Sequence, residues 1–388
     1  MIPNNYYDII IIGAGASGMA AAISAGNVFS ANSYSAAILL LEKNPEPGKK
    51  LLVTGHNRCN ITNTACEDYE TVLKFFSQIG FLLRLEKGAL YYPASGQAVS
   101  VRDALREGLC RTGADILLEH SVEAVQVKKA GFEVSTTLGA TFTTEKLILA
   151  TGGKAGPQFG CTGDGYSIAK ALGHSIVSPL PALVQLVCDE QTIKGRLAVL
   201  KGVRAKGAAS FYSRGRLLET SVGEIQFSES GLSGICIFDL SRHMREKDKD
   251  TCIILDLAPD YSKDEIERLL SERLPAGLNG ILPVKLARLV EEEARSDPGQ
   301  CAALIKEMAF NITGSKGWKE AQITSGGIAL HGIAPETLES KFTPGFYMCG
   351  EILDYDGKCG GFNLNWAWNT GIKAGRAAAR VILAKAGV

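Results

Sequence analysis

The chain has 388 residues, more than one ordinary compact core holds, so two or three domains are expected. Its 41 Lys and Arg residues balance 41 Asp and Glu residues, so no net charge draws the chain to nucleic acid or to an anionic membrane. No run of about 18 apolar residues occurs, and no membrane span is expected.

Ten cysteines are scattered along the chain, and no two of them have Cys-x-x-Cys spacing. This pattern argues against a zinc ribbon and against a thioredoxin-type dithiol, and no metal site is expected. Free thiols are typical of a reducing cytosol. The first apolar stretch is interrupted by glycines and follows no basic region, so we expect a cytoplasmic protein without a signal peptide.

The first forty residues have the order strand, glycine turn, helix, strand. Residues 7–12 form a β-branched run typical of a buried parallel strand, and 37–41 form a second one. Residues 19–25 predict a helix of small residues, and the polar stretch 26–35 predicts a surface loop. This order defines a βαβ unit.

The turn after the first strand carries glycines spaced for dinucleotide binding. Gly13 permits the tight turn, Gly15 lets the backbone approach a pyrophosphate, and Gly18 lets the helix pack closely on the sheet. The helix N-terminus offers unpaired N–H groups to the phosphates. The context of strand before and helix after strengthens an otherwise weak motif. The residues predicted to contact the cofactor here are Gly13, Gly15, Ala16, Ser17 and Gly18.

An acidic residue ends the second strand. Glu42 lies 24 residues after Gly18, against about 20 expected for the acid that binds a ribose. Its carboxylate would accept both ribose hydroxyls and would repel a 2′-phosphate. The alternative is a surface glutamate paired with Lys43.

The middle of the chain changes character twice. A helix (97–112), a hairpin (122–127 with 132–137) and a strand (146–150) are expected first, and a helix (164–172) follows a glycine-rich turn. Short strands then dominate residues 186–258, and helical spacing dominates 259–310. A strand at 345–348 and a long helix at 365–384 complete the pattern.

These changes predict an α/β fold with a discontinuous Rossmann-like FAD-binding domain, an inserted β-barrel-like domain and a helical domain. The expected boundaries are 1–185 with 322–388 for the first, 186–258 with about 311–321 for the second, and 259–310 for the third.

A second glycine-rich site near the C-terminus distinguishes FAD from NAD. Gly350-Glu351 is followed by Asp356-Gly357 and by Gly360-Gly361-Phe362-Asn363, which opens the last helix. Two nucleotide contacts roughly 300 residues apart suit an elongated cofactor such as FAD. The N-terminus of the last helix would stabilise negative charge on the reduced flavin ring.

The motifs as a set resemble the YhiN/BaiN family of flavoproteins, a branch of the glutathione-reductase-like FAD fold. The resemblance spans nearly the whole chain. Besides the glycine motifs it rests on Gly48-Lys49-Lys50-Leu51, Thr54-Gly55-His56-Asn57-Arg58-Cys59-Asn60, Ala150-Thr151-Gly152-Gly153, Thr162-Gly163-Asp164-Gly165-Tyr166, Gly231-Leu232-Ser233-Gly234 and Thr324-Ser325-Gly326-Gly327.

The resemblance implies positions for the parts of the cofactor. It places Glu42 and Lys43 at the adenosine ribose, Thr151 and Gly152 near the dinucleotide, and Glu351 at the ribityl or pyrophosphate part. Gly361, Phe362, Asn363 and Leu364 would lie at the isoalloxazine. The family usually has a glycine where this chain has His56, which leaves two readings: His56 points at the flavin, or it only tolerates a turn.

The polar loop before residue 60 adds further candidates. Lys50 and Arg58 either meet the pyrophosphate or an anionic substrate, or they stabilise the loop. Cys59 and Asn60 are candidates for approaching the cofactor. A reactive Cys359 is the less favoured alternative to a packed one.

Three kinds of function are compatible with these residues. The first is an FAD-dependent oxidoreductase that passes hydride through flavin N5, with NAD(P)H as a transient donor and a small-molecule substrate. The resemblance implies reduction of a conjugated C=C bond in a steroid-like acid. The alternatives are a flavin-dependent amine or aminoketone oxidase, and a flavin protein that acts on or senses RNA or a protein partner.

Overall fold

The computed structural model describes residues 5–245, 250–272 and 276–388, which fold into two compact units. The first unit joins the two ends of the chain, Met1–Pro179 and Ile323–Val388, and the second comprises Leu180–Gln322. Each unit has a hydrophobic cluster of its own.

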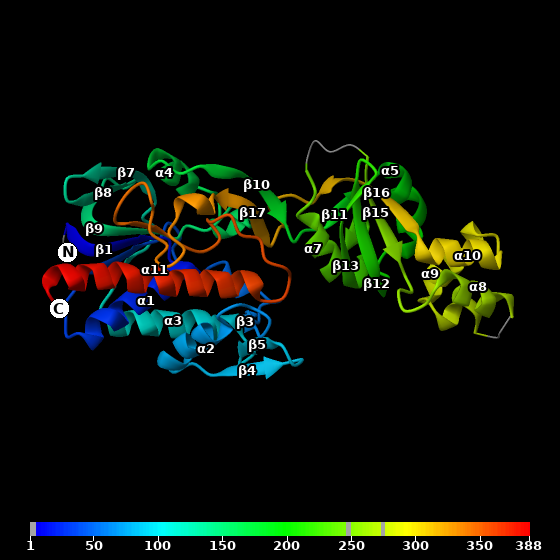
Figure 1. The fold of residues 1–388 in the computed structure, drawn as a ribbon, viewed down its shortest axis with the longest axis horizontal. Helices are drawn as coiled ribbons and strands as arrows, with labels where there is room; N and C mark the ends of the chain where they lie inside the picture. Colours follow the sequence, from blue (N-terminus) through cyan, green and yellow to red (C-terminus); the bar gives the residue numbers. More distant parts are fainter. Residues whose placement is uncertain (1–4, 246–249, 273–275) are drawn as a thin grey trace. The chain divides into compact units, whose positions relative to one another are not determined.

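A seven-stranded sheet forms the centre of the first unit (Figure 1). Its five parallel strands have the order β6, β2, β1, β9, β18, and β8 and β7 extend the sheet antiparallel to β9. Their bounds are β1 Tyr6–Ile12, β2 Ile38–Leu41, β6 Asp115–Leu117, β7 Val122–Lys128, β8 Gly131–Thr136, β9 Thr141–Leu149 and β18 Phe346–Met348. The β-branched and leucine-rich strands β1 and β2 are buried on both faces, as parallel strands require.

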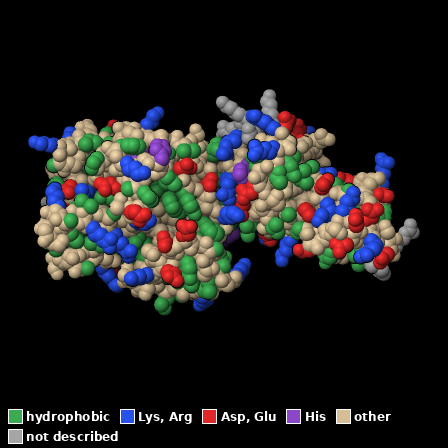
Figure 2. Space-filling model, viewed as in Figure 1, with side chains coloured by type: hydrophobic (Ala, Val, Ile, Leu, Met, Phe, Trp, Pro, Cys, Tyr) green, Lys and Arg blue, Asp and Glu red, His purple; other side chains and the backbone are tan. Residues whose placement is uncertain are grey.

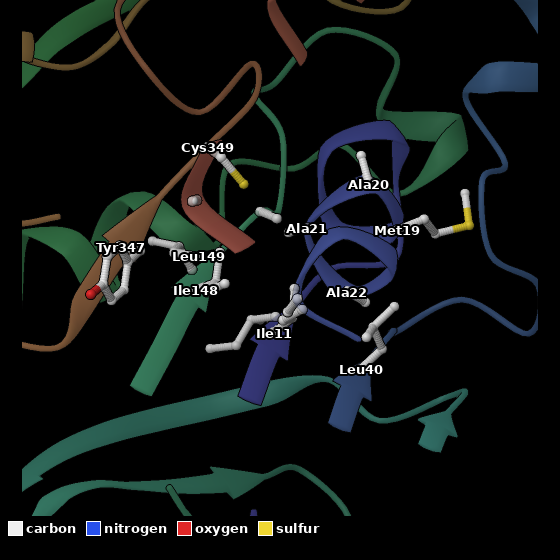
Figure 3. Close-up of a cluster of buried hydrophobic side chains, with 14 of the residues drawn as sticks. Ile11, Met19, Ala20, Ala21, Ala22, Leu40, Ile148, Leu149, Tyr347 and Cys349 are labelled. Atoms are coloured by element: carbon white, nitrogen blue, oxygen red, sulfur yellow. The ribbon is translucent and has the colours of Figure 1, made fainter. Parts of the chain in front are cut away.

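Three helices lie side by side against this sheet: α1 Ala16–Ala31, α3 Ala98–Thr112 and α11 Phe362–Ala386 (Figure 1). Small residues permit a close approach of α11 to α1. A Cβ atom at Gly371 would lie 2.3 Å from the carbonyl oxygen of Ser17, and one at Gly375 would lie 2.1 Å from that of Ala21. Figure 3 shows the resulting core, in which Ala20, Ala21 and Ala22 are among the side chains packed with those of the strands.

One expectation for this region is wrong. Residues 26–31 were expected in a surface loop, but they continue α1. Gly26 packs on Thr112 of α3, since a Cβ there would lie 2.4 Å from the threonine Cβ, and Phe29 is buried. Tertiary burial therefore extends the helix through a polar sequence.

The smaller elements of the first unit complete its fold. They are η1 Leu51–Val53, β3 Thr62–Asn63, α2 Tyr69–Gln78, β4 Leu83–Glu86, β5 Leu90–Pro93, η2 Pro157–Phe159, α4 Gly165–Ala171, β17 Ile323–Ile328 and η5 Leu330–Gly332. Strand β10 (Ile176–Ala182) pairs with β17.

The second unit is built on a closed barrel with the order β11, β14, β13, β12, β15, β16. The strands are β11 Leu186–Cys188, β12 Arg204–Ser213, β13 Arg216–Phe227, β14 Gly231–Ser233, β15 Thr251–Asp256 and β16 Met308–Ser315. Its helical elements are α5 Glu190–Thr192, η3 Ile193–Leu197, α6 Ala198–Leu200, α7 Ile235–Ser241, α8 Lys263–Ser271, η4 Gly277–Gly280, α9 Val284–Glu293 and α10 Pro298–Lys306.

The helices of the second unit share one core with the barrel. Ile266 of α8, Leu286 of α9 and Ile305 of α10 belong to the same cluster as Phe211 and Phe310 of the barrel strands. Local signals define these helices: Ser262 and Glu265 form a capping box at α8. Acidic and basic side chains are interspersed over the face seen in Figure 2, as the balanced composition predicts.

Candidate functional site

The turn between β1 and α1 combines two glycines required by packing with one that is not. A Cβ at Gly13, whose φ is 101°, would lie 2.6 Å from the carbonyl oxygen of Ala150. A Cβ at Gly18 would lie 1.9 Å from the carbonyl oxygen of Gly13. A Cβ at Gly15 would meet no protein atom within 4 Å. Packing within the protein therefore does not require glycine at position 15, and the open space beside it suits a ligand.

The N-terminus of α1 fits an anionic group. Gly15 caps the helix without a side-chain hydrogen bond, and its first turn, which includes Ala16, contains no acidic residue. The first N–H groups of such a helix have no partner within it and carry a partial positive charge. Ser17 is buried and its hydroxyl donates to the carbonyl of Cys349 across 3.5 Å. The turn is thereby fixed to the end of β18.

Glu42 is buried at the end of β2, beside this turn. Its Oε2 accepts from the Ala14 amide at 2.8 Å, and its Oε1 accepts from the backbone and side-chain nitrogens of Asn44 at 2.9 and 2.7 Å. A carboxylate has about four acceptor positions. The three contacts fix its orientation and leave about one position for a ligand hydroxyl.

Lys43 is held by the segment that precedes α4. Its ammonium group donates to the hydroxyl of Thr162 at 2.6 Å and forms an ion pair with Asp164. Burial opposes ionisation of Asp164, but hydrogen bonds from Lys43 and Thr162 outweigh it and lower the pKa of this carboxyl. The alternative pairing of Lys43 with Glu42 is not what the structure shows.

Lys50 and Glu351 meet from opposite ends of the chain. The Lys50 ammonium lies 2.6 Å from Glu351 Oε2, and Glu351 Oε1 accepts from the Thr324 amide at 3.0 Å. Burial would lower the pKa of Lys50, but the neighbouring Glu351 carboxylate overcomes it and the pKa is raised. The charges of Lys50 and Glu351 therefore compensate each other.

Arg58 is engaged away from the glycine turn. Its guanidinium binds Glu86 at 2.6 Å and lies 4.3 Å from the centre of the Tyr92 ring. These are the contacts of a loop-stabilising residue. His56 adopts the left-handed conformation with φ of 56° and is exposed.

Cys59 and Asn60 lie in the same loop and differ in character. Cys59 is fully buried, and burial raises the pKa of its thiol to about 12, so it is held as an unreactive thiol. The Oδ1 atom of Asn60 is buried without a hydrogen-bond partner and would lie 2.9 Å from a Cβ at Gly361. An orphaned buried acceptor beside the N-terminus of α11 is a feature that a ligand donor would satisfy.

The C-terminal glycines close the site. A Cβ at Gly350, whose φ is 84°, would lie 2.3 Å from the Ser17 hydroxyl oxygen. Gly361 precedes α11, and the Asn363 side chain bonds both the amide and the carbonyl of Gly357 at 2.9 Å. Asp356 accepts from Ser325. Phe362 and Leu364 are half-buried in the first turn of α11.

Thr151 and Gly152 follow β9 at the same edge of the sheet. Gly152 has φ of 73°, and a Cβ there would meet no atom within 4 Å. The Thr151 hydroxyl is buried without a hydrogen-bond partner. Together with the open position at Gly15 and the uncapped helix N-terminus, these observations show that the residues fit a dinucleotide cofactor.

Three residues that sequence reasoning did not select help to build the site: Asn44, Asp164 and Thr324. Asn44 orients Glu42, Asp164 holds Lys43, and the Thr324 hydroxyl accepts from the amides of Lys154 and Ala155 at 2.8 and 3.0 Å. Asp164 and Thr324 occur within glycine-rich motifs that signal close backbone approach. Asn44 carries no such signal.

The fold and this site define a Rossmann-like FAD-binding protein. The model of the HI0933-like protein Rossmann domain matches residues 67–377, and the chain belongs to this family. A 3-dehydro-bile acid delta(4,6)-reductase of Clostridium scindens is 34% identical over 95% of this chain and 98% of its own. A ribosomal RNA dihydrouridine synthase of Escherichia coli is 27% identical over 94% of this chain and 96% of its own.

A solved structure shares the fold. The open conformation of a flavocytochrome c3 fumarate reductase has a TM-score of 0.53 and 16% identity, over 98% of this chain and 79% of that one. The chain is an FAD-dependent oxidoreductase of the α/β class. No helix in the described ranges has the length and apolarity needed to cross a membrane.

Proposed function

We propose that this oxidoreductase reduces a C=C bond conjugated to a carbonyl group in a steroid-like acid, with NADH or NADPH as the electron donor. The observation that carries the proposal is the 34% identity to the bile acid reductase over 95% of the chain. A 3-dehydro bile acid with delta-4 and delta-6 double bonds contains such a conjugated system. The small-molecule substrate follows from the same relationship.

The reaction consumes one NAD(P)H and one proton. FAD, when bound by the residues described above, would supply the hydride-transfer chemistry between the donor and the double bond. In the substrate the C=C π bond breaks, one carbon gains the hydride and the other gains a proton, and the donor leaves as NAD(P)⁺. The protein contributes binding, orientation and charge stabilisation.

The chain's residues support this role in two places. The backbone N–H groups of Ala16, Ser17 and Gly18 would bind the pyrophosphate, and Glu42 would hold an adenosine ribose hydroxyl. Gly361 opens α11 with no acidic residue in its first turn, so its positive end would stabilise negative charge on the reduced ring. The ion pair of Lys50 and Glu351, whose charges compensate each other, would hold the part of the cofactor that lies between its adenosine half and its ring.

Anaerobic mixing of the holoprotein with NADH or NADPH tests the donor. We expect the flavin absorbance to bleach with at least one of them, and to return when a 3-oxo-4,6-diene bile acid is added. Loss of NAD(P)H should equal the number of C=C bonds reduced. Absence of bleaching with both donors would overturn the nicotinamide-linked proposal, and bleaching without reoxidation by the acid would overturn the substrate class.

Uridine in RNA is a second candidate substrate, favoured by the 27% identical ribosomal RNA dihydrouridine synthase. The C5=C6 bond of uracil is also conjugated to a carbonyl, so the same reaction class applies. The zero net charge argues against a strong phosphate contribution to binding. Reoxidation of the reduced flavin by ribosomal RNA, but not by the bile acid, would make this the function.

A further inference from the structure

A cavity of about 480 Å³ lies between the C-terminal halves of α1 and α11, away from the glycine turns. Its polar lining includes Ser24 and Asn27 of α1, Gln78 of α2, and Arg376 and Arg380 of α11. Its apolar lining includes Val28 and Leu383. The core accounts for Val28 and Leu383, but neither the core nor the flavin site accounts for the polar side chains.

The side chains that line the cavity carry positive charge only. Arg376 and Arg380 lie one helical turn apart, and no Asp or Glu occurs among the described residues that line the cavity. Val388 also lines it, and its α-carboxylate offsets at most one of the two guanidinium charges. Within the described part of the chain neither guanidinium forms an ion pair or donates to a helix carbonyl. Partial burial and, to a smaller extent, the nearby Arg380 lower the pKa of Arg376, so its charge is held at a cost that an anion would reduce.

A buried hydroxyl adds an independent observation. Ser24 is 2% exposed, lines the cavity, and its Oγ atom has no hydrogen-bond partner. Buried polar atoms in native proteins are nearly always satisfied. A group with acceptor oxygens in this cavity would neutralise the arginines, and rotation of the Ser24 side chain toward that group would satisfy the hydroxyl.

We propose that this cavity binds a phosphomonoester, with the phosphate between the two guanidiniums and the organic group against Val28 and Leu383. A phosphate offers three oxygens to the forked donors of two arginines, more than a carboxylate can. The cavity is larger than one phosphate, and its apolar wall suits an organic group.

The position excludes a direct part in hydride transfer. Ser24 lies eight residues after the start of α1, or about 12 Å along the helix, and Arg376 lies 14 residues after the start of α11, or about 21 Å. The same two helices present their N-termini to the cofactor. A ligand held by both would stabilise the first unit by mass action, without contacting the flavin.

Calorimetric titration of the FAD-saturated protein with phenyl phosphate, inorganic phosphate and benzoate tests the proposal. These probes carry no adenosine and do not mimic that half of FAD. We expect one saturable site for phenyl phosphate, with weaker binding of the other two. Arg376→Gln and Arg380→Gln should each weaken phenyl phosphate binding about tenfold or more, as loss of a charge-assisted contact does.

Lys373→Gln is the matched control, because Lys373 is a cation of the same helix that instead donates to the carbonyl of Pro335 at 3.1 Å. The affinity of the Lys373→Gln variant for phenyl phosphate should stay within about twofold of that of the wild type. Flavin content and melting temperature confirm that each variant is folded. Equal binding by the wild type and both arginine variants would overturn the site, as would no saturable binding. Tighter binding of benzoate would overturn the phosphate assignment.

Discussion

The two units of this chain share close backbone packing but use it differently. Gly18 on Gly13 and Gly371 on Ser17 bring backbones together in the first unit, and Gly231 on Leu186 does so in the second. In the first unit the closely packed turn leaves the N-terminus of α1 uncapped by a side chain and the position beside Gly15 open. In the second unit the close approach lies between strands of a closed barrel, whose interior is filled by large side chains such as Phe211 and Phe310. Close backbone packing thus opens space for a ligand in the first unit and closes a barrel in the second.

The largest expected effect is a loss of stability in the second unit, and it tests whether the two units unfold separately. Phe310→Ala removes a fully buried ring and should lower the free energy of unfolding of that unit by about 3–5 kcal/mol. Urea unfolding should then show an earlier transition for the second unit, while the flavin stays bound. Loss of flavin in step with that transition would show that the units do not behave separately.

A methyl group at Gly18 tests the backbone packing of the first unit. Gly18→Ala should lower the free energy of unfolding by about 3 kcal/mol, because its Cβ would lie 1.9 Å from a carbonyl oxygen. Gly15→Ala is the matched control, since no atom lies within 4 Å of its Cβ. Its stability without FAD should change by less than about 1 kcal/mol. Denaturant unfolding of the FAD-free proteins makes the comparison.

A larger side chain at position 15 separates cofactor binding from folding. Gly15→Val should weaken FAD binding about 100-fold, or about 2.7 kcal/mol, because the valine would occupy space assigned to the pyrophosphate. Flavin fluorescence during titration of the FAD-free protein measures the affinity. Unchanged affinity would contradict the assignment of this turn to the cofactor.

Glu42→Ala should lower both the stability of the fold and the affinity for FAD, each by less than Gly18→Ala and Gly15→Val do, respectively. It removes acceptors for Ala14 and Asn44, which should cost about 1–2 kcal/mol of stability, and it should weaken FAD binding about tenfold. Glu42→Gln keeps one acceptor oxygen and should recover part of both losses. Full FAD affinity in Glu42→Ala would remove this residue from the site.

The smallest effect concerns pH. Burial lowers the pKa of His174, whose Nε2 lies 2.7 Å from the Ser340 hydroxyl. The unfolded chain therefore takes up a proton near pH 6.5 that the folded chain resists, so stability is present above that pH and is lost as pH falls below it. His174→Gln should flatten the decline in free energy of unfolding between about pH 7 and 5. An equally steep decline would assign it to other groups.

The sequence determined the local parts of this protein. The run of isoleucines and leucines in β1 and β2 defined buried parallel strands, and the spacing of Gly13, Gly15 and Gly18 defined the turn between strand and helix, because such signals act over a few residues. The helical spacing after Ser262 likewise predicted helices that the structure contains.

Tertiary structure decided what depends on residues distant in sequence. Only the fold pairs Lys50 with Glu351 and directs Arg58 to Glu86, and the helix through residues 26–31 is accompanied by tertiary packing such as that of Gly26 on Thr112. The placement of the barrel and its helices in one core was also decided at this level. The physical reason is that a charged or small side chain has many compatible partners, and packing selects among them by the free energy of the whole fold.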